Sequence, residues 1–187
     1  MKSTFLGRSL MAAALLGCGV AGASTKGDNL PQGDDAIAKS VRHEVLMYPH
    51  YSMWDDVTFR VTNGQVELLG AVNQPFKKTD IERMVQKVAG VTSVTNDLKV
   101  LPVSFNDNRL RLQIARAIYR DPVFARYAMQ AIPPIHIIVD NGRVTLTGVV
   151  NNTMEKEIAG IRASGAGLSF GPVTNNLQVE NPAARKS

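Results

Sequence analysis

The sequence predicts an α+β fold built from two tandem αββαβ repeats. One stretch occurs twice, at residues 61–72 and 139–150, with valine, Asn-Gly, valine, leucine, glycine and valine at matching places. In each copy Asn-Gly separates two runs of alternating apolar residues, which is typical of a β-hairpin. Helical spacing of apolar residues before and after each hairpin predicts two helices per repeat. Each repeat should therefore be a three-stranded mixed sheet covered on one face by two helices.

In chain order, the first feature is an export signal over residues 1–23. Lys2 and Arg8 precede a short apolar run, and small residues around Ala23 supply a cleavage site. The apolar run is too short to span a bilayer. The remaining divisions are a leader at 24–33, repeats at 34–101 and 107–180, a connector at 102–106 and a tail at 181–187.

The single cysteine, Cys18, has two interpretations. Cleavage after Ala23 removes it, which leaves a mature periplasmic chain without thiol or disulfide chemistry. However, Leu15-Leu16-Gly17-Cys18 resembles a bacterial lipobox, in which the cysteine is acylated and holds the protein on a membrane. Both forms stay open from the sequence.

A helix is predicted before each hairpin. Each begins at an aspartate cap, Asp34 or Asp107, repeats apolar residues in steps of four, and stops at a proline, Pro49 or Pro122. The apolar residues expected to face the sheet are Ile37, Val41 and Val45 in the first repeat and Leu110, Ile114 and Ile118 in the second.

The hairpins themselves need glycine at two places. Gly64 and Gly142 follow asparagine in the turn, where both residues must take a positive φ. Gly70 and Gly148 fall on the inward face of the second strand, where glycine weakens a strand unless something approaches its backbone. We expect the following helix to make that approach.

A second helix and a third strand follow each hairpin. In the first repeat Pro75 occupies N1 and Gly90 ends the helix. In the second, Asn152 and Glu155 form a capping box, and Gly165 ends the helix. The residues expected to face inward there are Met154, Ile158 and Ile161. Residues 94–100 and 173–179 provide the third strands.

These patterns together resemble the BON domain. They comprise an Asp-led helix, V-x-N-G-x-V-x-L-x-G-x-V in each hairpin, and G-V-x-x-V-x-N-x-L-x-V at residues 90–100. The family includes the osmotically inducible periplasmic proteins of Gram-negative bacteria. The resemblance covers both repeats and implies an αββαβ fold, an envelope location and attachment to phospholipid, with no catalysis known for the domain. The second copy departs from the pattern in a longer loop at 165–172 and a longer segment containing Pro133-Pro134.

A search for reactive groups finds little. The three histidines, His43, His50 and His136, show no metal-ligand spacing with one another or with carboxylates. His136 should point outward from its strand, and Asp55-Asp56 should lie in a loop that leads into the first hairpin. No nucleophile motif or phosphate-binding loop is present. The sequence therefore predicts neither an enzyme nor a site for a cofactor or metal.

Charge is more informative. The chain is formally +5, and loss of Lys2 and Arg8 with the signal lowers this to +3. The excess lies on the helix at 107–122, where Arg109, Arg116 and Arg120 fall on one side at 100° per residue. Leu112 and Tyr119 lie beside them, and Arg126 follows the helix. Such a surface suits an anionic membrane, with arginines at phosphates and apolar side chains in the headgroup zone. Alternatively, Leu112 and Tyr119 pack on the first repeat and the arginines are solvated.

The leading hypothesis is a non-enzymatic envelope protein that binds phospholipid surfaces and supports envelope integrity under osmotic or similar stress. The candidate lipid-binding residues are Arg109, Arg116, Arg120, Arg126, Leu112 and Tyr119. The alternative is a periplasmic adaptor that binds another envelope protein through exposed sheet or helix surfaces. The modest charge and the export signal argue against nucleic acid as a partner. The mature sequence also contains no stretch that predicts a transmembrane helix.

Overall fold

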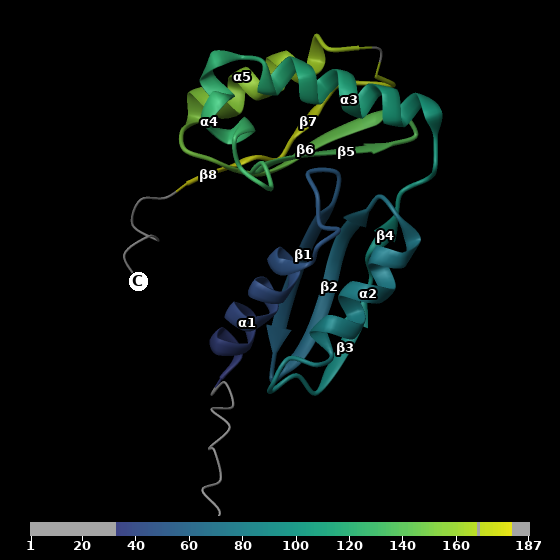
Figure 1. The fold of residues 1–187 in the computed structure, drawn as a ribbon, viewed down its shortest axis with the longest axis vertical. Helices are drawn as coiled ribbons and strands as arrows, with labels where there is room; N and C mark the ends of the chain where they lie inside the picture. Colours follow the sequence, from purple (N-terminus) through teal and green to yellow (C-terminus); the bar gives the residue numbers. More distant parts are fainter. Residues whose placement is uncertain (1–32, 168, 181–187) are drawn as a thin grey trace, which may run out of the picture.

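The computed structural model describes residues 33–167 and 169–180, which form two αββαβ units (Figure 1). The predicted signal, nearly all of the leader, Cys18 and the tail lie outside the described residues. Within the described part of the chain, every helix is too short or too polar to cross a membrane. The predicted α+β fold with two repeats is confirmed.

The elements follow the predicted order in both repeats. The first repeat contains α1 (Asp34–Met47), β1 (Asp56–Thr62), β2 (Gln65–Val72), α2 (Pro75–Val85), β3 (Ser93–Asn96) and β4 (Lys99–Val100). The second contains α3 (Phe105–Tyr119), η1 (Pro122–Phe124), α4 (Ala125–Ala128), β5 (Ile135–Asp140), β6 (Arg143–Val150), α5 (Thr153–Ser164), β7 (Thr174–Asn175) and β8 (Gln178–Val179). The short helices η1 and α4 occupy the longer segment of the second repeat.

Both hairpins have the predicted two-residue turns. Asn63 and Gly64 take φ values of 52° and 75°, and Asn141 and Gly142 take 51° and 76°. β1 is antiparallel to β2 and β5 to β6, whereas β3, β4, β7 and β8 run parallel to the central strands. Each sheet is therefore mixed, as predicted from the strand-helix-strand order.

The aspartates at the helix starts bind the hairpin turns rather than capping their own helices. The Asp34 carboxylate accepts hydrogen bonds from the backbone N–H groups of Asn63 and Gly64 at 2.7 and 2.9 Å. Asp107 accepts from Asn141 and Gly142, both at 2.9 Å. The cap prediction was therefore wrong in detail, since Gly33 precedes α1 and Ser104 caps α3 by accepting from Asp107 N–H. Each link fixes a helix to its hairpin.

The strand glycines are required by the neighbouring strand rather than by a helix. Gly70 and Gly148 have φ values of 111° and 108°, which side chains rarely tolerate. A Cβ on Gly70 would collide with the carbonyl oxygen of Asp56, and one on Gly148 with that of Pro134. Each glycine is thus closely approached, as predicted, but by the backbone at the start of the preceding strand and not by the following helix.

The third strand of each sheet is broken into two short pieces by an asparagine. Asn96 Nδ2 donates to the carbonyl oxygen of Lys78 on α2, and its Oδ1 accepts from Leu98 N–H. Asn175 makes the same contacts to Lys156 and Leu177. Both leucines are buried by the break. The asparagine of the repeated V-x-N-x-L pattern therefore ties strand to helix and turns the leucine inward.

Each repeat has its own apolar core between its sheet and its helices. The predicted inward residues of α1, α3 and both hairpins are buried or partly buried. On α5 the prediction was wrong: Met154 and Ile161 are exposed, whereas Ala159 and Ala163 are buried and Ile158 is partly buried. The small alanines let α5 lie close to the sheet, so the helix is rotated relative to its largest apolar residues.

The second sheet lies between the first repeat and the helices α3 and α5 (Figure 1). Ile138, on the sheet face away from these helices, packs with Ala71 and Leu101 of the first repeat. His136 is also buried there, with Nδ1 against the carbonyl oxygen of Asp55. His136 does point away from its own core as predicted, but the first repeat covers it.

Two polar contacts complete the junction between the repeats. Ile137 N–H, on the edge strand β5, donates to the carbonyl oxygen of Met53 at 2.8 Å. Lys99 Nζ lies 2.5 Å from Asp140 Oδ2. The first contact satisfies a strand edge that would otherwise be open to pairing with another chain.

A buried charged group lies behind the start of the second helix in both repeats. Asp55 forms a buried ion pair with Lys77, Nζ to Oδ2 2.6 Å, and accepts from Asn73 N–H. In the second repeat Glu155 stands where the first has Lys77, and it accepts from Asn151 N–H at 3.0 Å. The two acids accept from equivalent backbone N–H groups, those of Asn73 and Asn151, so structural contacts account for both buried carboxylates.

Candidate functional site

The most distinctive surface of the described chain is the outer face of α3 together with its C-cap residue Arg120. This face is formed by Phe105, Arg109, Leu112, Arg116 and Arg120. The opposite face buries Leu110, Ile114 and Ile118. Phe105 is 81% exposed and Leu112 is 48% exposed, so apolar side chains and arginines alternate along the outer face. The structure thus brings the three predicted helix arginines and Leu112 together on one exposed stripe.

The side chains of Arg109, Arg116 and Arg120 make no ion pair or hydrogen bond with any described residue. Arg111 differs, because it is buried and donates to Asn108 Oδ1 and to the carbonyl oxygen of Val139, both at 2.5 Å. Burial lowers the pKa of Arg111 from its usual value. Three guanidinium groups on α3 are therefore available to an external anion.

The structure places Arg126 away from this stripe. Its guanidinium pairs with Glu155 at the start of α5 and lies over the Tyr127 ring, 4.9 Å from the ring centroid. Tyr127 also donates to Glu155 Oε2 at 2.6 Å. This network holds α4 against α5. Arg126 therefore has a partner within the protein, unlike the three arginines on α3.

Tyr119 lies at the end of α3 and is partly buried against the second core. Its hydroxyl donates to the carbonyl oxygen of Ile135 at 2.6 Å. Burial raises the pKa of this hydroxyl. Tyr119 thus fixes α3 to β5 and also borders a groove shared with the first repeat.

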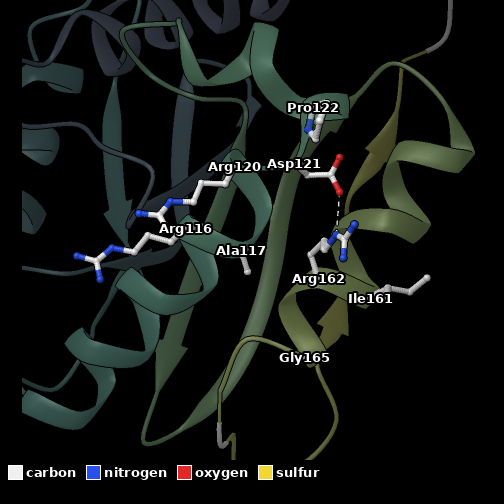
Figure 2. A pocket seen from close by; sticks show the side chains of 8 residues that line it. All are labelled: Arg116, Ala117, Arg120, Asp121, Pro122, Ile161, Arg162 and Gly165. Carbon is white, nitrogen blue, oxygen red and sulfur yellow. Dashed lines mark hydrogen bonds and ion pairs between the residues drawn. The ribbon is translucent and has the colours of Figure 1, made fainter.

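An open cleft of about 600 Å³ separates the end of α3 from α5 (Figure 2). Ile161 and Arg162 line one side, and Arg162 Nε donates to Asp121 Oδ2 at 2.7 Å. A hydrogen bond from Val123 N–H, and then this arginine, lower the pKa of Asp121. Arg116 and Arg120 extend to the other side of α3, away from Ile161 and Arg162 (Figure 2). Both residues line the cleft at the end of α3, but their guanidinium groups point away from Ile161 and Arg162.

Two exposed phenylalanines at the hairpin end of the second repeat were missed from the sequence. Phe105 lies at the start of α3, and Phe170, also 81% exposed, donates its N–H to the carbonyl oxygen of Gly142. Phe105 stands four residues before Arg109 and seven before Leu112, so helical spacing alone could have revealed it. Treating residues 102–106 as a connector hid that relation.

The equivalent face of α1 has a different character. Ala36, Lys39, His43 and Met47 occupy the positions that Arg109, Leu112, Arg116 and Arg120 occupy on α3. The alternation of arginine with apolar residues is therefore particular to the second repeat. Among the described residues, moreover, no group of three or more histidines and acids could hold a metal ion.

Comparison with solved structures identifies two structures of CdsD, a structural protein of the type III secretion system of Chlamydia trachomatis. One, its C-terminal domain, is 15% identical, covers 76% of this chain and 96% of its own, and has a TM-score of 0.27. The other is 16% identical, covers 80% and 95%, and has a TM-score of 0.28. No curated protein sequence matches this chain significantly.

The comparison with protein families is decisive. The BON domain model matches residues 33–102 and 106–181, which together account for most of the chain. These two segments contain the two αββαβ units with their repeated hairpin, glycine and asparagine features. The chain therefore belongs to the BON domain family and carries two BON domains in tandem.

Proposed function

We propose that this protein is a non-enzymatic periplasmic envelope protein that binds anionic phospholipid surfaces through the outer face of α3, and so supports the envelope under osmotic or similar stress. The observation that carries the proposal is the stripe of Arg109, Arg116 and Arg120, which have no side-chain partner among the described residues and which lie on the same face as exposed Phe105 and Leu112. Family membership and the export signal in the sequence support it.

The mechanism is electrostatic and interfacial. Each arginine near an anionic surface contributes about 1 kcal/mol, and this attraction fades within a Debye length, roughly 10 Å at 0.1 M salt. Phe105 and Leu112 would enter the headgroup zone, where burial of apolar area adds to the attraction. Binding should accordingly need anionic lipid and weaken with salt.

The arrangement of the two repeats suits this orientation. α3 covers the face of the second sheet that lies away from the first repeat (Figure 1). The second repeat could therefore lie on a membrane while much of the first repeat extends from it. The first repeat would then remain accessible to other envelope components.

Vesicle flotation of residues 24–187 tests the proposal. The chain is mixed with anionic or neutral vesicles at low and high salt, beside a variant in which Arg109, Arg116 and Arg120 are alanine. A matched control changes Arg42, Arg83 and Arg143 to alanine. These three are exposed and have no side-chain partner among the described residues, so both variants lose the same charge.

Salt-sensitive flotation with anionic vesicles, retained by the control and lost by the α3 variant, is the expected result. Equal losses in both variants would show that net charge, and not this face, drives binding. Absence of flotation with every vesicle would overturn direct lipid binding by the mature chain.

A second candidate function is a protein adaptor, and the observation that favours it is the outer edge of β1. β1 lies at the end of its sheet and pairs only with β2 among the described strands. An extended peptide could add to that edge. Lipid-free binding to a purified envelope protein, lost when Val61, whose N–H points away from β2, is changed to proline but kept by the α3 variant, would support the adaptor.

A further inference from the structure

A groove of about 330 Å³ lies at the junction of the repeats and shares Leu112, Arg116 and Arg120 with the candidate membrane-binding face. The first repeat contributes the loop before β1, and the second contributes α3, α4 and the segment before β5. The apolar and aromatic residues that line it are Met53, Trp54, Leu112, Ala115, Tyr119, Ala128 and Pro133. Its volume falls within the range of small-molecule pockets, roughly 300–1,000 Å³.

Two cations complete the lining of this groove, Arg116 and Arg120. Neither guanidinium has a partner among the described residues, and both extend to the same side of α3 (Figure 2). Among the described residues, no carboxylate lines the groove. The hydroxyl of Tyr119 is already donated to Ile135, so the remaining polar capacity of the lining is positive.

We propose that the groove binds one molecule of a monomeric long-chain fatty acid, with its hydrocarbon chain against Trp54 and Leu112 and its carboxylate on Arg116 and Arg120. An apolar groove with arginines at its margin matches a ligand that has an anionic head and a single apolar tail. Guanidinium groups bind carboxylates in a planar, two-bond geometry that fixes the head.

Charge also argues against residues 181–187 of this chain as the occupant. The C-terminal segment 181–187 carries Arg185 and Lys186, which the two groove arginines would repel. An external anionic amphiphile avoids that repulsion. The fatty acid would use Leu112, Arg116 and Arg120, which are also assigned to membrane contact. The inference therefore rests on the proposed function and deepens it, and it needs a test that separates the two.

Formation of the groove depends on the docking of the repeats. Trp54 packs against the second core, and the Met53 carbonyl oxygen is held by Ile137 N–H at 2.8 Å. One wall therefore comes from the first repeat and the other from α3. A ligand that fills the groove should stabilise the docked arrangement, because it binds that state alone.

Trp54 provides the readout, since it is the only tryptophan of the chain. Residues 24–187 are titrated with decanoate, dodecanoate and tetradecanoate below their micelle concentrations, and with a bromine-labelled fatty acid that quenches tryptophan on contact. We expect saturable quenching of Trp54 with one site. Affinity should rise roughly three- to four-fold for each added methylene buried in the groove.

Two kinds of variant separate the groove from the membrane face. Ala128→Phe and, independently, Ala115→Leu fill the groove without altering any arginine, and each should weaken fatty-acid binding at least ten-fold while leaving vesicle flotation intact. Arg116→Gln with Arg120→Gln should weaken both activities. Arg42→Gln with Arg83→Gln, on exposed sites of the first repeat, should change neither. Circular dichroism verifies that each variant is folded.

Several results would overturn the groove proposal. Quenching that does not saturate, affinity that is independent of chain length, or unchanged binding by both folded groove-filling variants would each do so. A Trp54 response to vesicles or to an amphipathic peptide but not to monomeric fatty acid would assign the groove to that other occupant. Flotation that persists in any of these cases leaves the proposed membrane function standing.

Discussion

At the scale of single residues, Gly148 shows how a local contact fixes a residue type. Its φ of 108° and the nearby Pro134 carbonyl oxygen together exclude a side chain. Gly148→Ala should therefore lower the free energy of unfolding by about 2–4 kcal/mol. Gly171→Ala, at a φ of 112° in open space, should cost only about 1–2 kcal/mol. Urea denaturation measures both, and equal losses would contradict a steric role for Pro134.

The position of Gly148 was predictable, but its contact was not. A glycine among inward-facing apolar residues indicates a close approach whatever its source. Identifying the source required the register of β5 on β6, which pairs Ile135 with Gly148 and brings Pro134 beside the glycine. Sequence alternation reports which residues share a face but not how the entry to a strand bends.

Asp56 should make stability depend on pH. Burial raises the pKa of this carboxyl above its usual 3.8, while the nearby His136 lowers it in part. The protonated form is thus favoured in the folded state, and its stabilising contribution is full below pH 3.8 and is lost as pH rises through the raised pKa.

Asp56→Asn stays neutral at every pH and should remove this loss. We expect the variant to gain melting temperature relative to the wild type as pH increases from 3 to 7. Thermal unfolding followed by circular dichroism across that range measures the difference. Asp97→Asn, at an exposed site, is the control. A parallel pH dependence in wild type and Asp56→Asn would contradict the burial of this charge.

At the scale of elements, the link between helix and hairpin should carry much of each repeat's stability. Asp34 accepts two backbone hydrogen bonds from the turn at residues 63–64, whereas the side chain of its exposed neighbour Asp35 makes no hydrogen bond or ion pair with any described residue. Asp34→Ala should lower the free energy of unfolding by about 1–3 kcal/mol, because it leaves the N–H groups of Asn63 and Gly64 without their acceptor. Asp35→Ala should change stability by about 0.5 kcal/mol or less.

Both aspartates lie in the first turn of α1, so each substitution removes a similar interaction with the helix dipole. Chemical denaturation of the two variants compares them directly. If Asp35→Ala is as destabilising as Asp34→Ala, the helix dipole and not the hairpin turn explains the aspartate. Asp107 accepts the equivalent pair of turn hydrogen bonds in the second repeat, so the same reasoning applies to it.

The helices were predictable to different degrees. Where large apolar residues repeat every three or four positions, as in α1 and α3, the buried face followed from sequence. On α5 the large residues Met154 and Ile161 are exposed, and the sheet is contacted through Ala159 and Ala163. A prediction that places the largest apolar residues of a helix in the core is wrong where close packing favours small side chains.

At the scale of the whole molecule, β5 explains how the repeats dock. Residues 135–139 are buried on both faces of the strand, in contrast to the half-buried alternation of β1. Apart from His136 these residues are all apolar, and a run of this kind is typical of a strand covered on both sides. That signal was present in the sequence, but nothing in it identified the first repeat as the cover.

Ile138→Asp should separate the repeats without unfolding them. Ile138 packs with Ala71 and Leu101 across the junction and does not belong to the core of its own repeat. Burial of an unpaired carboxylate there is costly, so the junction should open. Small-angle scattering should report a larger radius of gyration, with unchanged far-ultraviolet circular dichroism.

Val149→Asp provides the control for Ile138→Asp, because Val149 lies on the neighbouring strand and is 47% exposed. It should leave the scattering profile unchanged. If Ile138→Asp has the same compact profile as the wild type, the apolar contact between the repeats is not what holds them together. Opening of the junction should also abolish fatty-acid binding, since one wall of the groove is lost.

The candidate membrane surface was predicted in part. The three α3 arginines and Leu112 were identified from helical spacing, and they do share one exposed face. The contacts of Arg126 with Glu155 and of Tyr119 with Ile135 depend on tertiary packing between distant segments. The sequence left open whether Tyr119 contacts a membrane or packs on the first repeat. The structure places its side chain against β5.

The most direct test of the central claim is an environment-sensitive fluorophore on α3. Residues 24–187 contain no cysteine, so Leu112→Cys and, separately, its α1 counterpart Lys39→Cys each accept one label. With anionic vesicles at low salt, we predict a blue shift and a rise in emission at residue 112 that high salt reverses, and no change at residue 39. An equal response at both residues, or a response at residue 39 alone, would contradict membrane binding through the outer face of α3.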